Sequence, residues 1–409
     1  MGIKQDIAVL RSLASQVAEI AALPRQEKTR RMWSNLNGLK PDRPMVMIDQ
    51  VCWNEMNVND ELTLKCQDPE LRVWEQQLRQ TLYTWRHMPA DYVVEGFFRV
   101  PKAVNGYNDM GVQAKEELLE SDISNGVVSH AYANQFKTMD DIAKIKTPVI
   151  THDAKETNRR ETLAREVFDG ILDVRMEGME PYLALWDIIA TWMSVEGALY
   201  ALADDPELIH ALVKRVVECL MTGLDQLEEQ GLLCGQQSWI HCTGAWSEDL
   251  PANVDKPKTK DIWMFGLAQM FSTVSPAMFE EFEIEPCMQL FERFGLVYYG
   301  CCDPLDLKMK EARRIPNLRK VSMSPWADKR RGAMGIGSDY VFSFKPNPAF
   351  LATATFDEGL VRKDLMETVA ICKEFGCPLE MILKDISTVR YEPQRLWKWA
   401  EIAMEVVNV

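Results

Sequence analysis

The chain has 409 residues, of which 47% are hydrophobic, and it carries a formal net charge of -15 with a pI of about 5.0. This length suits either one large α/β barrel with insertions or two smaller domains, and the apolar content is enough for a substantial core. The acidic balance argues against binding to nucleic acid or to an anionic membrane surface.

Ten cysteines are scattered along the chain without the spacing of a small disulfide framework. We see no signal peptide and no apolar stretch as long as a membrane span. We therefore expect a cytoplasmic protein with reduced thiols and no membrane partner.

Apolar positions recur at helical spacing over residues 5–38, and Pro24 is expected to divide this region into two helices. We predict residues 1–40 to be an N-terminal helical extension and residues 41–409 to be the main domain. A helix around 68–86, a hairpin excursion within 110–137, an extra segment at 236–242 and an exposed loop at 247–260 are further expectations.

The main domain contains eight short apolar segments that we predict to be buried strands. They begin near residues 45, 91, 171, 261, 296, 320, 340 and 380. Strands that alternate with helices indicate parallel βαβ units, and eight units indicate an α/β fold of the (β/α)8 or TIM-barrel type.

Two adjacent cysteines, Cys301 and Cys302, follow the apolar run Leu296–Tyr299. Ligands of parallel α/β proteins bind just beyond the carboxyl ends of the strands. Thiols in that place suggest soft-metal or nucleophile chemistry. The alternative is that both cysteines are small buried apolar residues.

Three stretches resemble a known family: Phe271–Phe282 (FSTVSPAMFEEF), Tyr298–Pro304 (YYGCCDP) and Tyr340–Pro348 (YVFSFKPNP). They are similar to the uroporphyrinogen decarboxylase superfamily, whose branches include the corrinoid-dependent methyltransferases of anaerobic methyl metabolism. The order of elements agrees from about residue 40 to the end, and the resemblance implies the same barrel.

The decarboxylases of this superfamily carry an arginine-rich loop after the first strand, whereas Ile48–Trp53 contains no arginine. The acidic Asp49 and Glu95 would also receive a polycarboxylate poorly. The resemblance therefore implies a methyltransferase that moves a methyl group from a small donor, such as an aromatic methyl ether (O-demethylation), to the cobalt of a corrinoid. A decarboxylase of a smaller substrate and a non-catalytic binding barrel remain alternatives.

No cobalamin-binding domain is visible in the sequence, so we expect the cobalamin to arrive on a partner corrinoid protein; a homodimer is a further expectation. The methyltransferase branch holds zinc through a His-x-Cys pair at the fifth strand and a cysteine at the eighth. Here Cys301 is close to the first of these cysteines, but Tyr299 or Gly300 stands at the histidine position and the eighth strand ends in Lys384 and Asp385.

We accordingly predict a zinc ion bound by Cys301 or Cys302 together with His241 or carboxylates, or else no metal at all. His241 could equally be a structural histidine.

Asp49, Lys384 and Asp385 end the first and last strands, which are neighbours in a closed barrel, and a Lys–Asp pair there could protonate a leaving alkoxide. It could equally be a structural ion pair. Glu95 lies in an apolar strand, where a carboxylate is costly unless it is paired or functional, so we count it among the catalytic candidates. We predict a substrate site that includes Trp53, Glu177, Gln269, Trp326 and Lys345.

Overall fold

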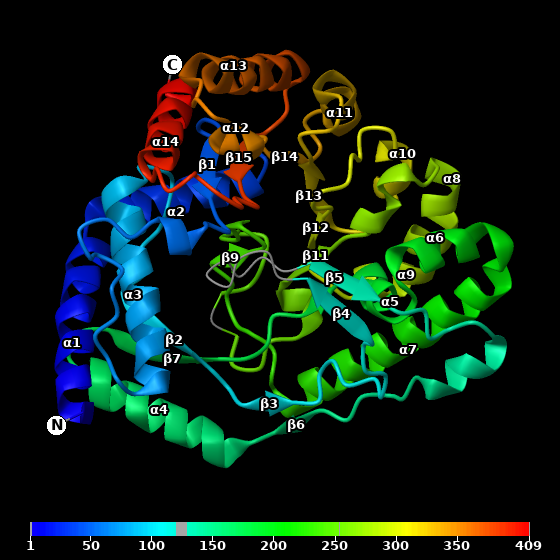
Figure 1. The fold of residues 1–409 in the computed structure, drawn as a ribbon, viewed down its shortest axis with the longest axis horizontal. Coiled ribbons are helices and arrows are strands. Elements are labelled where there is room, and N and C mark those ends of the chain that lie inside the picture. Colours follow the sequence, from blue (N-terminus) through cyan, green and yellow to red (C-terminus); the bar gives the residue numbers. More distant parts are fainter. Residues whose placement is uncertain (1, 120–128, 253, 409) are drawn as a thin grey trace.

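The computed structural model describes residues 2–119, 129–252 and 254–408. Figure 1 shows helices on the outside of the molecule and strands toward its middle. Seven strands form one parallel sheet in the order β1-β15-β14-β13-β12-β11-β8. Their bounds are β1 Met45–Ile48, β8 Tyr182–Leu183, β11 Trp263–Gly266, β12 Leu296–Tyr299, β13 Leu318–Met323, β14 Val341–Phe344 and β15 Leu379–Leu383.

A second parallel pair joins β2 (Phe97–Pro101) to β7 (Asp173–Glu177), and only four residues separate β7 from β8. This arrangement is TIM-barrel-like, with all eight expected segments contributing a strand. The closed barrel that we expected is not formed by the ladders of the described residues, because β2 and β7 pair only with each other.

The second strand begins later than predicted. Val93 and Val94 are packed by contacts outside the sheet: Val93 lies partly buried in the cluster around Trp33, and the N–H of the buried Val94 donates to the side chain of Gln26 at 2.9 Å. Their apolar character therefore comes from packing against the N-terminal helices, and Glu95 precedes β2 instead of ending it.

Helix α1 (Gly2–Ala21) ends before Pro24, which begins α2 (Pro24–Asn37), as predicted. It packs on α3 (Pro69–His87) and α4 (Ala154–Phe168), over a buried cluster that includes Phe98 of β2. The remaining helices are α5 Leu185–Met193, α6 Val195–Asp204, α7 Pro206–Gln230, α8 Pro276–Phe279, α9 Glu285–Phe291, α10 Met309–Ala312, α11 Lys329–Ile336, α12 Ala349–Ala352, α13 Glu358–Phe375 and α14 Gln394–Val407.

Three antiparallel pairs lie outside the main sheet: β3 (Val104–Asn105) with β6 (Thr151–His152), β4 (Glu116–Leu119) with β5 (Ser129–Tyr132), and β9 (Trp239–Ile240) with β10 (Thr243–Gly244). The second pair is the hairpin predicted within 110–137, and its tip falls outside the described residues. The third pair occupies the predicted extra segment.

The β9–β10 hairpin packs against the inner face of the main sheet, and Figure 1 places β9 near the middle of the molecule. Ile240 of the hairpin shares a buried cluster with alternate residues of β11 and β12, namely Trp263, Phe265, Leu296 and Tyr298. The intervening residues Met264, Val297 and Tyr299 point to the opposite face of the sheet and belong to the large buried cluster beneath the helices. Period-two alternation thus separates an inner face from an outer face.

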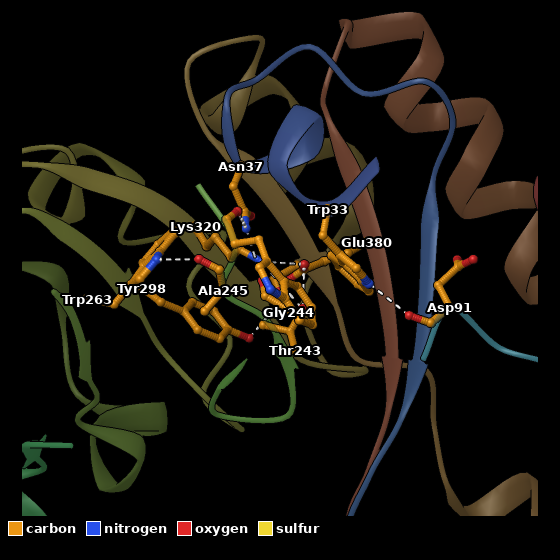
Figure 2. A network of polar contacts seen from close by, with 12 residues as sticks. Trp33, Asn37, Asp91, Thr243, Gly244, Ala245, Trp263, Tyr298, Lys320 and Glu380 are labelled. Atoms are coloured by element: carbon orange, nitrogen blue, oxygen red, sulfur yellow. Dashed lines mark hydrogen bonds and ion pairs between the residues drawn. The ribbon is translucent and has the colours of Figure 1, made fainter. Parts of the chain in front are cut away.

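A buried polar network fixes this hairpin to the amino-terminal half of the strands (Figure 2). Lys320 Nζ donates to Glu380 Oε2 at 2.7 Å and to the Gly244 carbonyl at 3.2 Å, and the Thr243 hydroxyl donates to Glu380 at 2.8 Å. The strands of the hairpin are thereby anchored to the amino-terminal half of the sheet, and the turn between them extends toward the carboxyl ends of the strands, where His241 lies 3.3 Å from Cys301 Sγ.

Within the described ranges, no single helix is both long enough and apolar enough to cross a membrane. Taken together, α1 and α2 reach that length and apolarity, but they are bent by 66° relative to each other.

Candidate active site at the carboxyl ends of the strands

The chain turns sharply at Gly300, directly after β12. Gly300 has φ +91°, and a Cβ atom there would lie 2.5 Å from Leu305 Cδ1, so only glycine suits the position. The turn is completed by the Cys301 N–H, which donates to Asp303 Oδ1 at 3.2 Å. It leaves Cys301 buried and Cys302 exposed.

Cys301 Sγ is the centre of a group of four side chains, which we call the thiolate cluster: His241, Cys301, Cys302 and Lys384. Lys384 Nζ donates to Cys301 Sγ at 2.9 Å, His241 Nε2 lies 3.3 Å from the same sulfur, and Cys302 Sγ lies 3.4 Å from it. One ammonium group, one imidazole nitrogen and one further sulfur therefore face the Cys301 sulfur.

Two separate elements bring these partners to Cys301. Lys384 follows β15 and continues the inward alternation of Glu380 and Ile382. His241 occupies the turn of the β9–β10 hairpin, with a positive φ of 31°, and its ring stacks on Phe265 with centroids 3.7 Å apart.

These contacts favour the ionised form of Cys301. The hydrogen bond from Cys302 lowers the pKa of the Cys301 thiol, with further lowering by His241 and the Lys384 charge, against the effect of burial. Burial alone would lower the pKa of Lys384, but the Cys301 thiolate outweighs it and raises that pKa. Burial lowers the pKa of His241, so its imidazole is neutral. The cluster is a thiolate–ammonium pair beside a neutral imidazole.

Asp385 lies at the solvent edge of this cluster. Its Oδ2 is 3.2 Å from Lys384 Nζ and 3.5 Å from Cys302 Sγ, and half of its side chain is exposed. Asp49, at the end of the neighbouring β1, faces Cys242, whose pKa is raised by burial and then by the charge of Asp49. The two predicted aspartates therefore follow the carboxyl ends of two paired strands, β1 and β15.

The sequence analysis missed a second polar group near Cys301, built on β8 and the start of α5. The Tyr182 hydroxyl donates to Asp187 Oδ2 at 3.3 Å, and Gln269 Nε2 donates to Asp187 Oδ1 at 3.4 Å. Burial, with the charge of Cys301 as a smaller cause, raises the pKa of Asp187. Tyr182 and Asp187 are polar residues in an apolar run just after a predicted strand, and this signal was available in the sequence.

Glu95 and Glu177 are held by an arginine. Arg99 pairs with Glu95 at 2.7 Å and with Glu177, and the Ser238 hydroxyl donates to Glu95 at 3.0 Å. Nearby, burial raises the pKa of Glu180 to about 7. Across the described ranges, no hydrogen bond connects Glu95 or Glu177 with the thiolate cluster.

The remaining predicted substrate residues are dispersed. Lys345 is buried next to Tyr298 and Ser343, with an Nζ–Oγ distance of 2.8 Å to Ser343, and burial lowers its pKa to about 8. Trp53 packs edge-on against Tyr83 of α3, at 5.8 Å between ring centroids, which places it in the helical layer. Trp326 is 73% exposed on the loop after β13.

The arrangement of the predicted ligands does not fit zinc. A zinc ion needs three protein donors about 2.0–2.3 Å from one point, and across residues 2–119, 129–252 and 254–408 no three His, Cys, Asp or Glu side chains are grouped to hold a metal ion. The predicted ligands His241, Cys301 and Cys302 do lie together, but the Lys384 ammonium lies among them. Its Nζ is 2.9 Å from Cys301 Sγ, 3.5 Å from His241 Nε2 and 4.0 Å from Cys302 Sγ. A positively charged ammonium group thus faces the three side-chain atoms that would have to bind the zinc ion.

No family model and no curated protein matches this chain. Among solved structures, the chain is similar to a methyltransferase from Methanosarcina mazei, with a TM-score of 0.50 and 12% sequence identity over 92% of this chain and 97% of that chain. At this identity the likeness shows the fold, a TIM-barrel-like α/β architecture along almost the whole length of both proteins.

Proposed function

We propose that this chain is a methyltransferase that moves a methyl group from a small donor, such as an aromatic methyl ether, to the cobalt of a corrinoid carried by a separate protein. The observation that carries the proposal is the thiolate cluster with Asp187 beside it, at the carboxyl ends of the strands. Barrel enzymes carry their chemistry at that end. The fold likeness to a methyltransferase over 92% of the chain supports the same class.

The chemistry requires a proton donor. When the cobalt nucleophile attacks the methyl carbon, the carbon–oxygen bond breaks and the oxygen keeps the electron pair, so the leaving alkoxide or phenoxide must gain a proton. Asp187 suits this role because its raised pKa keeps more of it protonated than an ordinary aspartic acid, and Tyr182 and Gln269 orient it. Lys384, which the sequence analysis considered as a proton donor together with an aspartate, instead donates its hydrogen bond to Cys301 Sγ.

The proposal is tested with purified protein, free cob(I)alamin and a panel of aromatic methyl ethers. Methylation of the cobalt is followed by absorbance, and carbon dioxide release from aromatic acids is measured in parallel. We expect cobalt methylation that falls by about 10²-fold in Asp187→Asn, the scale of a lost general acid. The matched control is Asp204→Asn, an exposed aspartate at the end of α6.

Cobalt methylation that is absent with every donor would reject the proposal. Carbon dioxide release in the same preparation would then favour the decarboxylase alternative.

A further inference from the structure

We infer that the Lys384 ammonium takes the place of a metal ion among His241, Cys301 and Cys302, and that Cys301 is a metal-free nucleophile for soft carbon electrophiles. This inference goes beyond the proposed function and does not rest on it, because its tests require neither a methyl donor nor a corrinoid.

The first argument is the position of the ammonium. Lys384 Nζ lies 2.9, 3.5 and 4.0 Å from Cys301 Sγ, His241 Nε2 and Cys302 Sγ, so one cation faces all three donor atoms. Its side chain is only 3% exposed, and Asp385 Oδ2 contacts it at 3.2 Å from the solvent side. A metal ion at this place would lie against a buried positive charge, so the ammonium and the metal are alternatives.

The second argument is charge balance. A buried ammonium is costly unless it is paired, and the groups that contact Lys384 Nζ in the described structure are the thiolate cluster and Asp385. Its shortest contact is with Cys301, which is itself buried. Cys301 as a thiolate and the half-exposed Asp385 carboxylate therefore share the balancing charge, and His241 Nε2 lies within hydrogen-bond distance of the thiolate.

A thiolate that is not bound to a metal keeps its lone pair for attack. With iodoacetamide as the probe, a Cys301 Sγ lone pair forms the new sulfur–carbon bond while the carbon–iodine bond breaks and iodide leaves with its electron pair. No oxidant or reductant takes part. The product is a neutral thioether beside Lys384.

The first experiment measures metal binding. The native protein, Lys384→Met, Lys384→Arg and the double variant Lys384→Met/Cys301→Ser are dialysed against Zn²⁺ or Co²⁺ and analysed for metal content and for cobalt–thiolate absorption. Lys329→Met is the matched control, because Lys329 pairs with Asp364 between α11 and α13, away from the thiolate cluster.

We expect no cobalt–thiolate absorption in the native protein, Lys384→Arg or Lys329→Met. Lys384→Met should gain close to one metal ion per chain, since removal of the ammonium frees three donors, and the double variant should lose it. Cobalt–thiolate absorption in the native protein that disappears in Cys301→Ser would overturn the inference.

The second experiment measures reactivity in a Cys302→Ser background, so that only one thiol of the adjacent pair remains. Iodoacetamide labelling of Cys301 at neutral pH is followed by peptide mass spectrometry. An ordinary thiol is only a few per cent ionised at pH 7, so Lys384→Met should slow labelling by about tenfold or more, while Lys384→Arg retains it.

Equal labelling rates in the native and Lys384→Met backgrounds would overturn the inference. A third measurement does not depend on any change at position 384. The ultraviolet absorbance of a thiolate should be present in the native protein and reduced in Cys301→Ser, and its absence from the native protein would also overturn the inference.

Discussion

At the scale of single residues, the two adjacent cysteines differ in their surroundings. Cys301 is buried against Lys384 and His241, whereas Cys302 is exposed and contacts Asp385. Hydrogen bonding to Cys301 and burial raise the pKa of Cys302, so it stays a thiol. One residue is thus the charged partner of the lysine, and its neighbour donates a hydrogen bond to it.

We predict that Cys301→Ser lowers methyl transfer by about 10²-fold or more, because a serine hydroxyl remains neutral beside the ammonium. Cys302→Ser should lower it by less than about tenfold, because a hydroxyl still donates a hydrogen bond to Cys301. Cobalt methylation and thermal melts of both variants measure the difference. Equal turnover near the native level in both variants would remove the cysteines from the mechanism.

Reasoning from strand ends gave His241, Cys301 and a carboxylate such as Asp385 as candidate ligands of one metal ion, because the carboxyl ends of parallel strands meet at one edge. It assigned Lys384 separately, to a Lys–Asp pair that could donate a proton. It did not show that the Lys384 ammonium would face the two sulfur atoms. That fact depends on the packing of a hairpin turn against β15, which leaves no local trace in the sequence.

At the scale of secondary-structure elements, a buried ion pair joins three parts of the barrel. Lys320 of β13 and Glu380 of β15 are both fully buried, and Thr243 of β10 donates to the same carboxylate. The Lys320 ammonium also lies over the rings of Trp33 and Trp263, at 5.5 and 5.8 Å from their centroids. Figure 2 shows that this group connects the hairpin with the strands that surround it.

We predict that Lys320→Met destabilises the protein by about 3–5 kcal/mol, because it leaves a buried carboxylate without its counter-charge. The double variant Lys320→Met/Glu380→Met should lose less than the sum of the single losses, since it removes both charges. Urea denaturation at neutral pH measures each free energy of unfolding. Lys363→Met, at an exposed position of α13, is the control and should change stability by no more than about 0.5 kcal/mol. Additive losses would show that the pair is not coupled.

Most elements were predictable because apolar runs of four to six residues separated by helical segments indicate parallel strands. The displaced start of β2 shows where this reasoning stops. Val93 and Val94 contact Trp33 and Gln26 of α2, and a sequence pattern does not distinguish that kind of packing from burial in a sheet. As a result of this later start, Glu95 precedes β2, and it pairs there with Arg99 of the strand.

At the scale of the whole molecule, the predicted N-terminal extension is tied to the barrel. Trp33 Nε1 donates to the Asp91 carbonyl at 2.8 Å, and the side chain of Asn37 donates to the Gly244 carbonyl at 3.0 Å. Helix α1 covers the cluster between α3, α4 and β2. The first two helices therefore share contacts with the strands and with the inner hairpin.

This integration predicts that the first helix contributes to global stability. Leu10 is fully buried in the cluster beneath α1, so Leu10→Ala should lower the free energy of unfolding by about 2–5 kcal/mol through lost apolar contact and the cavity that remains. Ile3, on the same helix, is 53% exposed, and Ile3→Ala should cost no more than about 0.5 kcal/mol. Both losses are measured by urea denaturation followed through tryptophan fluorescence, to which Trp74 of the same cluster contributes as one of the 12 tryptophans of the chain. If Leu10→Ala were as mild as Ile3→Ala, the helix would be a peripheral addition whose packing does not support the barrel.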